Sequence, residues 1–192
     1  MELKDRMRSA AAGLLDAGLA YPVQPTEYDT AWAARLTGDD GTPAYPHLID
    51  WLIERQHEDG SWGGQIPYLP DRLLSTLAVT VMLARLEDPG YTDPLARGER
   101  YLKQNLRYLE DEIDRPVGFE LILPALFTEA RDLGMDLSYN SLPEYELERD
   151  EKLSLLPMDR LFSTQTTALF SLEAFGDNFD AESVANLLLK DG

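Results

Sequence analysis

The stretch that decides the fold is DRLLSTLAVTVMLARL, residues 71–86. Leu73, Leu74, Leu77 and Val81 recur in it at intervals of three and four residues, which is the spacing of one face of an α-helix. This spacing predicts a long helix with an apolar face in a core. The chain has no convincing segment in which apolar and polar residues alternate, as they do in a half-buried β-strand. The sequence therefore predicts an all-α fold.

Helical spacing continues on both sides of this stretch. The expected helices cover residues 3–18, 28–36, a segment opened by Pro46, and residues 94–114, 119–133, 144–151, 158–175 and 180–190. Residues 38–46 are the most loop-like internal segment. Helices end in Asp-Gly at residues 59–60 and again at residues 191–192, and such a repeat is typical of stacked α-architectures. We therefore expect a longer polypeptide that continues past Gly192.

The composition limits the classes of function. With 192 residues the chain can bury one proper core. It has 17 Lys and Arg against 35 Asp and Glu, a net charge of −18, which argues against binding nucleic acid or anionic membranes through a basic patch. Cysteine is absent, so thiolate metal sites and cysteine nucleophiles are excluded. No run of apolar residues is long enough for a membrane span and no targeting segment is recognised, so a cytoplasmic location is predicted.

Four carboxylates fall within five residues in the run EDEID, residues 110–114. Pro116 disfavours helical geometry at the residue before it, so the helix over 94–114 is expected to stop near Asp114. Glu110 and Asp114 would then share one face at the negative end of the helix dipole. A Mg²⁺ ion that also contacts a substrate phosphate would neutralise them. Surface ion pairs with Lys103 and Arg107 are the alternative explanation.

Several segments together resemble the class II diterpene cyclases of the copalyl diphosphate synthase type. They agree in order and spacing over roughly residues 20–192. The segments are YDTAW (28–32), DGSWG (59–63) with Gln56, DRLLSTLA (71–78), EDEID (110–114), PVGFE (116–120) with PAL (124–126), and TTAL (166–169) with SLE (171–173).

The resemblance implies an α/α-barrel, the γ domain of a βγ architecture. Residues 1–20 would be the first helix of the β domain, residues 21–178 the γ domain, and residues 179–192 the start of the return into a truncated β domain. Glu110, Asp111 and Asp114 match a motif associated with Mg²⁺ and the substrate diphosphate. Lys152 resembles a basic residue that reaches the diphosphate in some relatives, with a solvated surface lysine as the alternative, and Arg149 is a weaker candidate still.

The implied activity is that of an isomerase, a bacterial-type enzyme of diterpene biosynthesis that converts geranylgeranyl diphosphate to ent-copalyl or a related diphosphate. Protonation of the terminal alkene starts this cyclisation, and its acid is the middle Asp of a DxDD motif. No DxDD occurs in this chain, so no catalytic residue is assigned and the chain alone is expected to be inactive. One alternative is a non-catalytic helical module whose acidic cluster binds a basic protein. Another is a related terpene synthase with a vestigial γ domain, against which the intact acidic motif argues.

The remaining conspicuous residues are interpreted as structural. Tryptophans at helical spacing or beside turns are core residues far more often than cation-stabilising walls, and this applies to Trp32, Trp51 and Trp62. Asp29 and the pair Asp71 and Arg72 are expected to cap or pair helix ends. His47 and His57 show no metal-ligand spacing.

Overall fold

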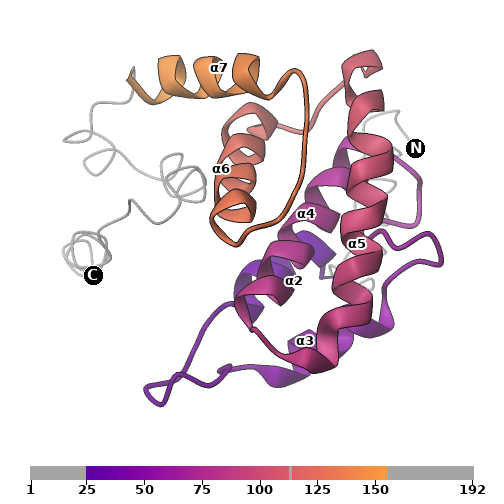
Figure 1. Cartoon of the computed structure of the whole chain (residues 1–192), viewed down its shortest axis with the longest axis vertical. Coiled ribbons are helices and arrows are strands. Elements are labelled where there is room, and N and C mark those ends of the chain that lie inside the picture. The colour runs from indigo at the N-terminus through magenta and orange to yellow at the C-terminus, as the bar shows by residue number, and fades with distance from the viewer. Residues whose placement is uncertain (1–24, 113, 155–192) are drawn as a thin grey trace, which may run out of the picture.

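The computed structural model describes residues 25–112 and 114–154. In this part of the chain the helices are α2 (Glu27–Ala34), α3 (Pro46–Glu54), α4 (Leu69–Arg85), η1 (Pro89–Tyr91), α5 (Thr92–Asn105), η2 (Leu106–Asp111), α6 (Phe119–Asp132) and α7 (Leu142–Ser154) (Figure 1). The only β-pairing among these residues is one isolated bridge, between Thr37 and Pro43. The all-α prediction is confirmed. The helices expected over residues 3–18, 158–175 and 180–190 lie outside the described residues.

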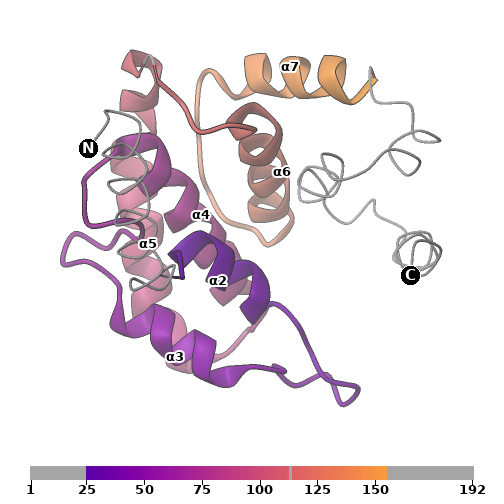
Figure 2. The same ribbon diagram turned by 180° about the vertical axis from the view of Figure 1, so that it is seen from behind.

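The predicted long helix is α4, and it is the central helix of the described part. It contacts α2, α5 and α6. Leu73, Leu77 and Val81 are fully buried, as their spacing predicts, and Thr76 and Thr80 between them are fully buried too. A helix covered on nearly every side is a core helix rather than an amphipathic surface helix. Seen from both sides, α6 lies beside this group with α7 across its end (Figures 1 and 2).

Gly98 allows α5 to approach α4 closely. A Cβ atom at this position would lie 2.7 Å from Oγ1 of Thr80 and 2.9 Å from Cζ3 of Trp62. Both distances are shorter than van der Waals contact, so a larger residue here would push the two helices apart. The indole of Trp62, fully buried, fills the space that this close packing defines.

The predicted helix over residues 94–114 is wrong at its C-terminal end. The α-helix α5 stops at Asn105 and continues as the 3₁₀-helix η2, and Glu112 then has extended backbone angles (φ −84°, ψ 122°). Leu106 and Leu109 are both buried, and residues three apart lie above one another in a 3₁₀-helix. An α-helix prolonged to Asp114 would also have placed a cluster of carboxylates at its negative end, which is unfavourable. The chain turns away before Pro116 instead.

Gly118 begins the next helix. Its φ of +79° is a left-handed value that favours glycine, and α6 starts at the following residue. Glu120 lies in the first turn of α6, where the positive end of the helix dipole stabilises a carboxylate. Arg115, shortly before α6, lies close to α7, because its guanidinium lies over the ring of Tyr145 in that helix.

Candidate functional site

A polar pocket lies next to the acidic run. It has a volume of about 290 Å³ and brings together residues from η2, from the segment before α6, from the loop after α6 and from α7. Its lining is mostly polar and consists of Glu110, Arg115, Tyr139, Ser141, Glu144, Tyr145 and Glu148. Of the residues predicted as a Mg²⁺ and diphosphate site, only Glu110 lines this pocket.

Glu110 is held in place across the pocket. Its Oε1 accepts a hydrogen bond of 3.0 Å from the hydroxyl of Ser141, thirty-one residues later in the chain. Ser141 comes just before α7, so this bond ties the end of η2 to the start of α7. The side chain of Glu110 is otherwise exposed and keeps free acceptor positions toward the pocket.

Asp111 and Asp114 do not join Glu110. Both are exposed and neither lines the pocket. The backbone carbonyl of Asp114 accepts a hydrogen bond of 2.9 Å from the hydroxyl of Tyr68, near the start of α4. The expectation that Glu110 and Asp114 share one helix face is wrong, because it required an α-helix where the chain forms a 3₁₀-helix followed by an extended segment.

The described residues contain no group of three His, Asp or Glu side chains close enough to hold a metal ion. Glu110, Asp111 and Asp114 therefore do not fit a metal site preformed by protein ligands alone. Mg²⁺ is often bound by one or two carboxylates together with substrate phosphates and water. In that mode of binding, Glu110 alone could be the protein ligand, without Asp111 and Asp114.

Lys152 is engaged by two carboxylates. On α7 it forms an ion pair with Glu120 of α6 and a second one, of 3.2 Å, with Glu148 one turn earlier on its own helix. Burial opposes the ionisation of Glu120, but the hydrogen bond from Lys152 outweighs it and holds the pKa of that carboxyl below its usual value. The hydrogen bond to Glu120 likewise raises the pKa of Lys152. The ammonium group thus holds α7 against α6, and its charge is already balanced.

Arg115 differs from Lys152 in this respect. Its guanidinium forms no ion pair with a carboxylate in the described part of the chain, although three glutamates line the same pocket. Its Cζ lies 4.9 Å from the ring centroid of Tyr145, a cation–π arrangement. The guanidinium therefore keeps its hydrogen-bond donors available at the pocket.

Two tyrosines form the buried wall of the pocket. Tyr139 and Tyr145 are 7% and 4% exposed, and their ring centroids lie 6.0 Å apart. Burial raises the pKa of Tyr145, and its neighbour Tyr139 raises it further. The two hydroxyls are close enough to influence each other, but neither makes a hydrogen bond of ordinary geometry within the described residues. These residues and Arg115 were not predicted from the sequence, because no motif or periodicity links positions on three separate elements.

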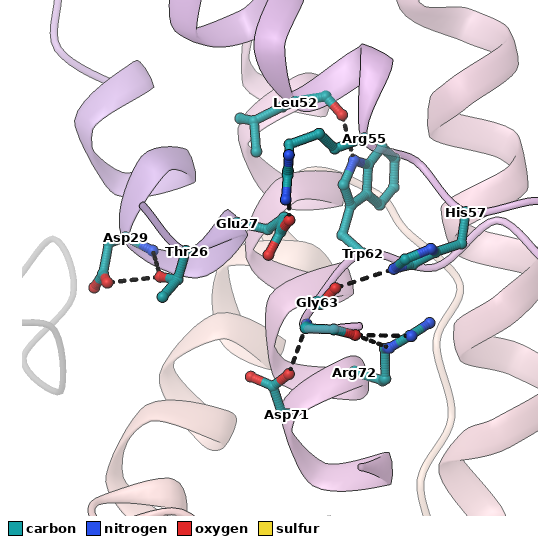
Figure 3. A network of polar contacts seen from close by, with 11 residues as sticks. Thr26, Glu27, Asp29, Leu52, Arg55, His57, Trp62, Gly63, Asp71 and Arg72 are labelled. Atoms are coloured by element: carbon teal, nitrogen blue, oxygen red, sulfur yellow. Dashed lines mark hydrogen bonds and ion pairs between the residues drawn. The ribbon is translucent and has the colours of Figure 1, made fainter. Parts of the chain in front are cut away.

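The aromatic turn has a structural role, as predicted. Trp62 is fully buried, and its Nε1 donates a 2.6 Å hydrogen bond to the backbone carbonyl of Leu52 (Figure 3). Its backbone N–H donates to Oγ1 of Thr76 at 2.9 Å. These bonds join the end of α3 to the middle of α4. A buried tryptophan whose N–H groups both donate hydrogen bonds is a packing residue, and Trp62 does not line the polar pocket.

The acidic and basic residues around this turn are structural too. Asp71 accepts from the backbone N–H of Gly64, and Arg72 donates to the carbonyl of Gly64 and to the hydroxyl of Ser61. Asp29 accepts from the hydroxyl of Thr26, whose side chain caps α2 (Figure 3). Nε2 of His57 lies 3.0 Å from the carbonyl oxygen of Gly63. The predicted capping and pairing roles are confirmed.

Known diterpene synthases are similar to this chain in sequence and structure. It is 37% identical over its whole length to the bifunctional levopimaradiene synthase of Pinus banksiana, of which it covers 22%. It superimposes on abietadiene synthase from Abies grandis with a TM-score of 0.76 and 35% identity, over 85% of this chain and 22% of that one. For ent-copalyl diphosphate synthase from Arabidopsis thaliana the TM-score is also 0.76, with 34% identity over 85% of this chain and 24% of that one.

The proteins that match this chain are diterpene synthases. The resemblance read from its motifs is confirmed, and the all-α fold is that of solved terpene cyclases. The chain spans about a fifth of the length of the curated cyclases that it matches. No protein-family model matches it.

Two predictions about origin and location are contradicted by these cyclases. The relatives from Pinus banksiana, Abies balsamea, Ginkgo biloba and Abies grandis are plant enzymes named as chloroplastic. The bacterial source and the cytoplasmic location predicted from the sequence are therefore wrong by comparison with the family. The cytoplasmic prediction rested on the absence of a recognised targeting segment, which carries little weight for a chain that spans a fifth of its relatives. None of the described helices has the length and apolar character needed to cross a membrane.

Proposed function

We propose that this chain is the γ-domain region of a class II diterpene cyclase that converts geranylgeranyl diphosphate to ent-copalyl or a related labdane diphosphate, an isomerisation. The observation that carries the proposal is the 34% identity and the TM-score of 0.76 with ent-copalyl diphosphate synthase. That structure is a complex with (S)-15-aza-14,15-dihydrogeranylgeranyl thiolodiphosphate. The same geranylgeranyl diphosphate class of substrate is assigned to the complete enzyme here.

The proposed division of the chain follows the family architecture. Residues 1–20 would be the first helix of the β domain, residues 21–178 the γ domain, and residues 179–192 the return toward the β domain. No DxDD sequence occurs in the chain, so the acid that protonates the alkene would come from elsewhere in the complete enzyme. The chain alone is therefore expected to be catalytically inactive.

Within this function, the described residues would contribute to the diphosphate end of the site. Glu110 would bind Mg²⁺ together with the substrate diphosphate, because a carboxylate and phosphate oxygens are ligands that this ion prefers. The ion would offset repulsion between the glutamates and the diphosphate. Asp111 and Asp114, exposed at the surface beside the pocket, would add negative potential that attracts Mg²⁺ to Glu110. Lys152 would act indirectly, by holding α7 in place.

A chimera tests the proposal. The region of Arabidopsis ent-copalyl diphosphate synthase that matches this chain is replaced by the 192 residues, and the purified chimera is incubated with geranylgeranyl diphosphate and Mg²⁺. We expect copalyl diphosphate, detected by gas chromatography and mass spectrometry after dephosphorylation, from the chimera and unchanged substrate from the isolated chain. A folded chimera without product would contradict the proposal, as would product from the isolated chain.

The alternative, a non-catalytic interaction module, is not favoured. The relatives that match this chain are named as synthases, not as binding proteins. A basic protein partner would also bind without Mg²⁺, whereas the proposed function requires the ion. The chimera therefore separates the two functions as well.

A further inference from the structure

The polar pocket contains donors and acceptors that the chain itself leaves unused. The exposed guanidinium of Arg115 forms no ion pair with a carboxylate in the described part of the chain. The buried hydroxyls of Tyr139 and Tyr145 influence each other but make no hydrogen bond of ordinary geometry there. A buried polar group without a partner costs free energy, on the order of 1–3 kcal/mol. Two such hydroxyls beside a guanidinium that forms no ion pair indicate a ligand that accepts hydrogen bonds from all three.

The charges at the pocket select the chemistry of that ligand. A guanidinium presents a planar set of N–H donors that matches phosphate oxygens in pairs, and tyrosine hydroxyls can donate to further oxygens. Three glutamates, Glu110, Glu144 and Glu148, line the same pocket, so a bare polyphosphate would be repelled. Lys152 compensates only Glu148 of the three. A diphosphate that carries Mg²⁺ would suit both groups of side chains. The metal would face the glutamates, and the phosphate oxygens would face the guanidinium and the tyrosine hydroxyls.

We propose that Arg115 contacts the diphosphate directly as a substrate-binding residue of this pocket, with Tyr145 and Tyr139 donating from the buried wall and Glu110 and Glu144 on the metal side. This inference rests on the proposed function for the identity of the substrate. The argument that the pocket binds a diphosphate rests on its side chains alone. It assigns the phosphate contact to Arg115 rather than to Lys152, whose ammonium is held by Glu120 and Glu148. The ring of Tyr145 under the guanidinium fixes the direction in which Arg115 points.

Inorganic diphosphate is the probe for the test. Isothermal titration calorimetry of the 192-residue chain measures its binding with and without Mg²⁺, and circular dichroism checks that each variant stays helical. We expect binding only with Mg²⁺, weakened about tenfold to hundredfold in Arg115→Gln, which is the usual loss when a charge-assisted hydrogen bond is removed. Tyr145→Phe keeps the ring and is expected to weaken binding severalfold.

Arg107→Gln is the matched control. It removes one positive charge from η2, a few residues before Arg115, but Arg107 donates to the hydroxyl of Tyr108 and does not line the pocket. Its affinity for diphosphate should stay within about twofold of the parent. Lys152→Gln, by contrast, should weaken binding less than Arg115→Gln does.

The outcomes separate this inference from the proposed function. Equal affinities for the parent and Arg115→Gln, equal losses in Arg115→Gln and Arg107→Gln, or no binding by the folded parent at millimolar diphosphate would each overturn the assignment of Arg115. None of these results would predict whether the chimera is active, so the test of the proposed function stays independent. An inactive chimera together with Arg115-dependent binding would refute the cyclase function and leave the phosphate site in place.

Discussion

At the scale of single residues, Gly98 shows how packing overrides helix propensity. An alanine in the middle of a helix is normally more stable than glycine by about 0.5–1 kcal/mol. At Gly98, however, the added Cβ would lie under 3.0 Å from Thr80 and Trp62, and overpacking of this kind costs about 1–3 kcal/mol. The clash is therefore expected to outweigh the gain in helix propensity, so that alanine at this position destabilises the fold.

Gly98→Ala should lower the free energy of unfolding by about 1–2 kcal/mol net, measured by urea denaturation. Ala96→Gly on the exposed face of the same helix is the control, with a cost of about 0.5–1 kcal/mol from propensity alone. A Gly98→Ala variant more stable than the parent would show that α4 and α5 separate without penalty.

At the scale of elements, one ion pair joins α7 to α6. The pKa of Glu120 lies below its usual value because of the hydrogen bond from Lys152, so the stabilisation from this pair is fully present above the ordinary glutamate pKa. It is lost as the pH falls through the lowered pKa of Glu120. The attachment of α7 should therefore weaken in acid, below about pH 4.

Thermal unfolding of the parent and of Glu120→Gln between pH 7 and pH 3 checks this expectation. The melting temperature of the variant should be lower at pH 7, and the difference from the parent should shrink below about pH 4. Glu146→Gln breaks the exposed pair with Arg131 and should have little effect at any pH. A difference between parent and Glu120→Gln that stays constant with pH would mean that the charge of Glu120 does not matter.

At the scale of the whole molecule, self-repulsion is the dominant electrostatic feature. A net charge of −18 on 192 residues destabilises the compact state, and salt screens such repulsion over about 10 Å at 0.1 M. Raising NaCl from 10 to 300 mM should increase the melting temperature of the isolated chain by several degrees. Mg²⁺ at equal ionic strength should add little, because the described residues hold no preformed three-ligand site. A large, saturable gain from Mg²⁺ alone would contradict this and restore the three-carboxylate site.

The sequence by itself determined the helical class, the positions of most helices and the resemblance to diterpene cyclases. Spacing of apolar residues is local information, so α4 was found within two residues of its ends, and α3 begins at Pro46 as predicted. The structural interpretation of Trp62 and of the pair Asp71 and Arg72 also followed from the sequence, because turns and helix ends are set by neighbouring residues. The location was predicted wrongly from the sequence, and the chloroplastic relatives corrected it.

Only the tertiary structure decided which charged residues meet. The carboxylates of EDEID are neighbours in sequence, yet the change from α-helix to 3₁₀-helix at Leu106 leaves Glu110 in the pocket and Asp111 and Asp114 outside it. Lys152, predicted as a candidate diphosphate contact, pairs with Glu120 because α7 packs on α6. Contacts between residues twenty or thirty positions apart depend on helix packing, which is a property of the assembled core and not of any local stretch of sequence.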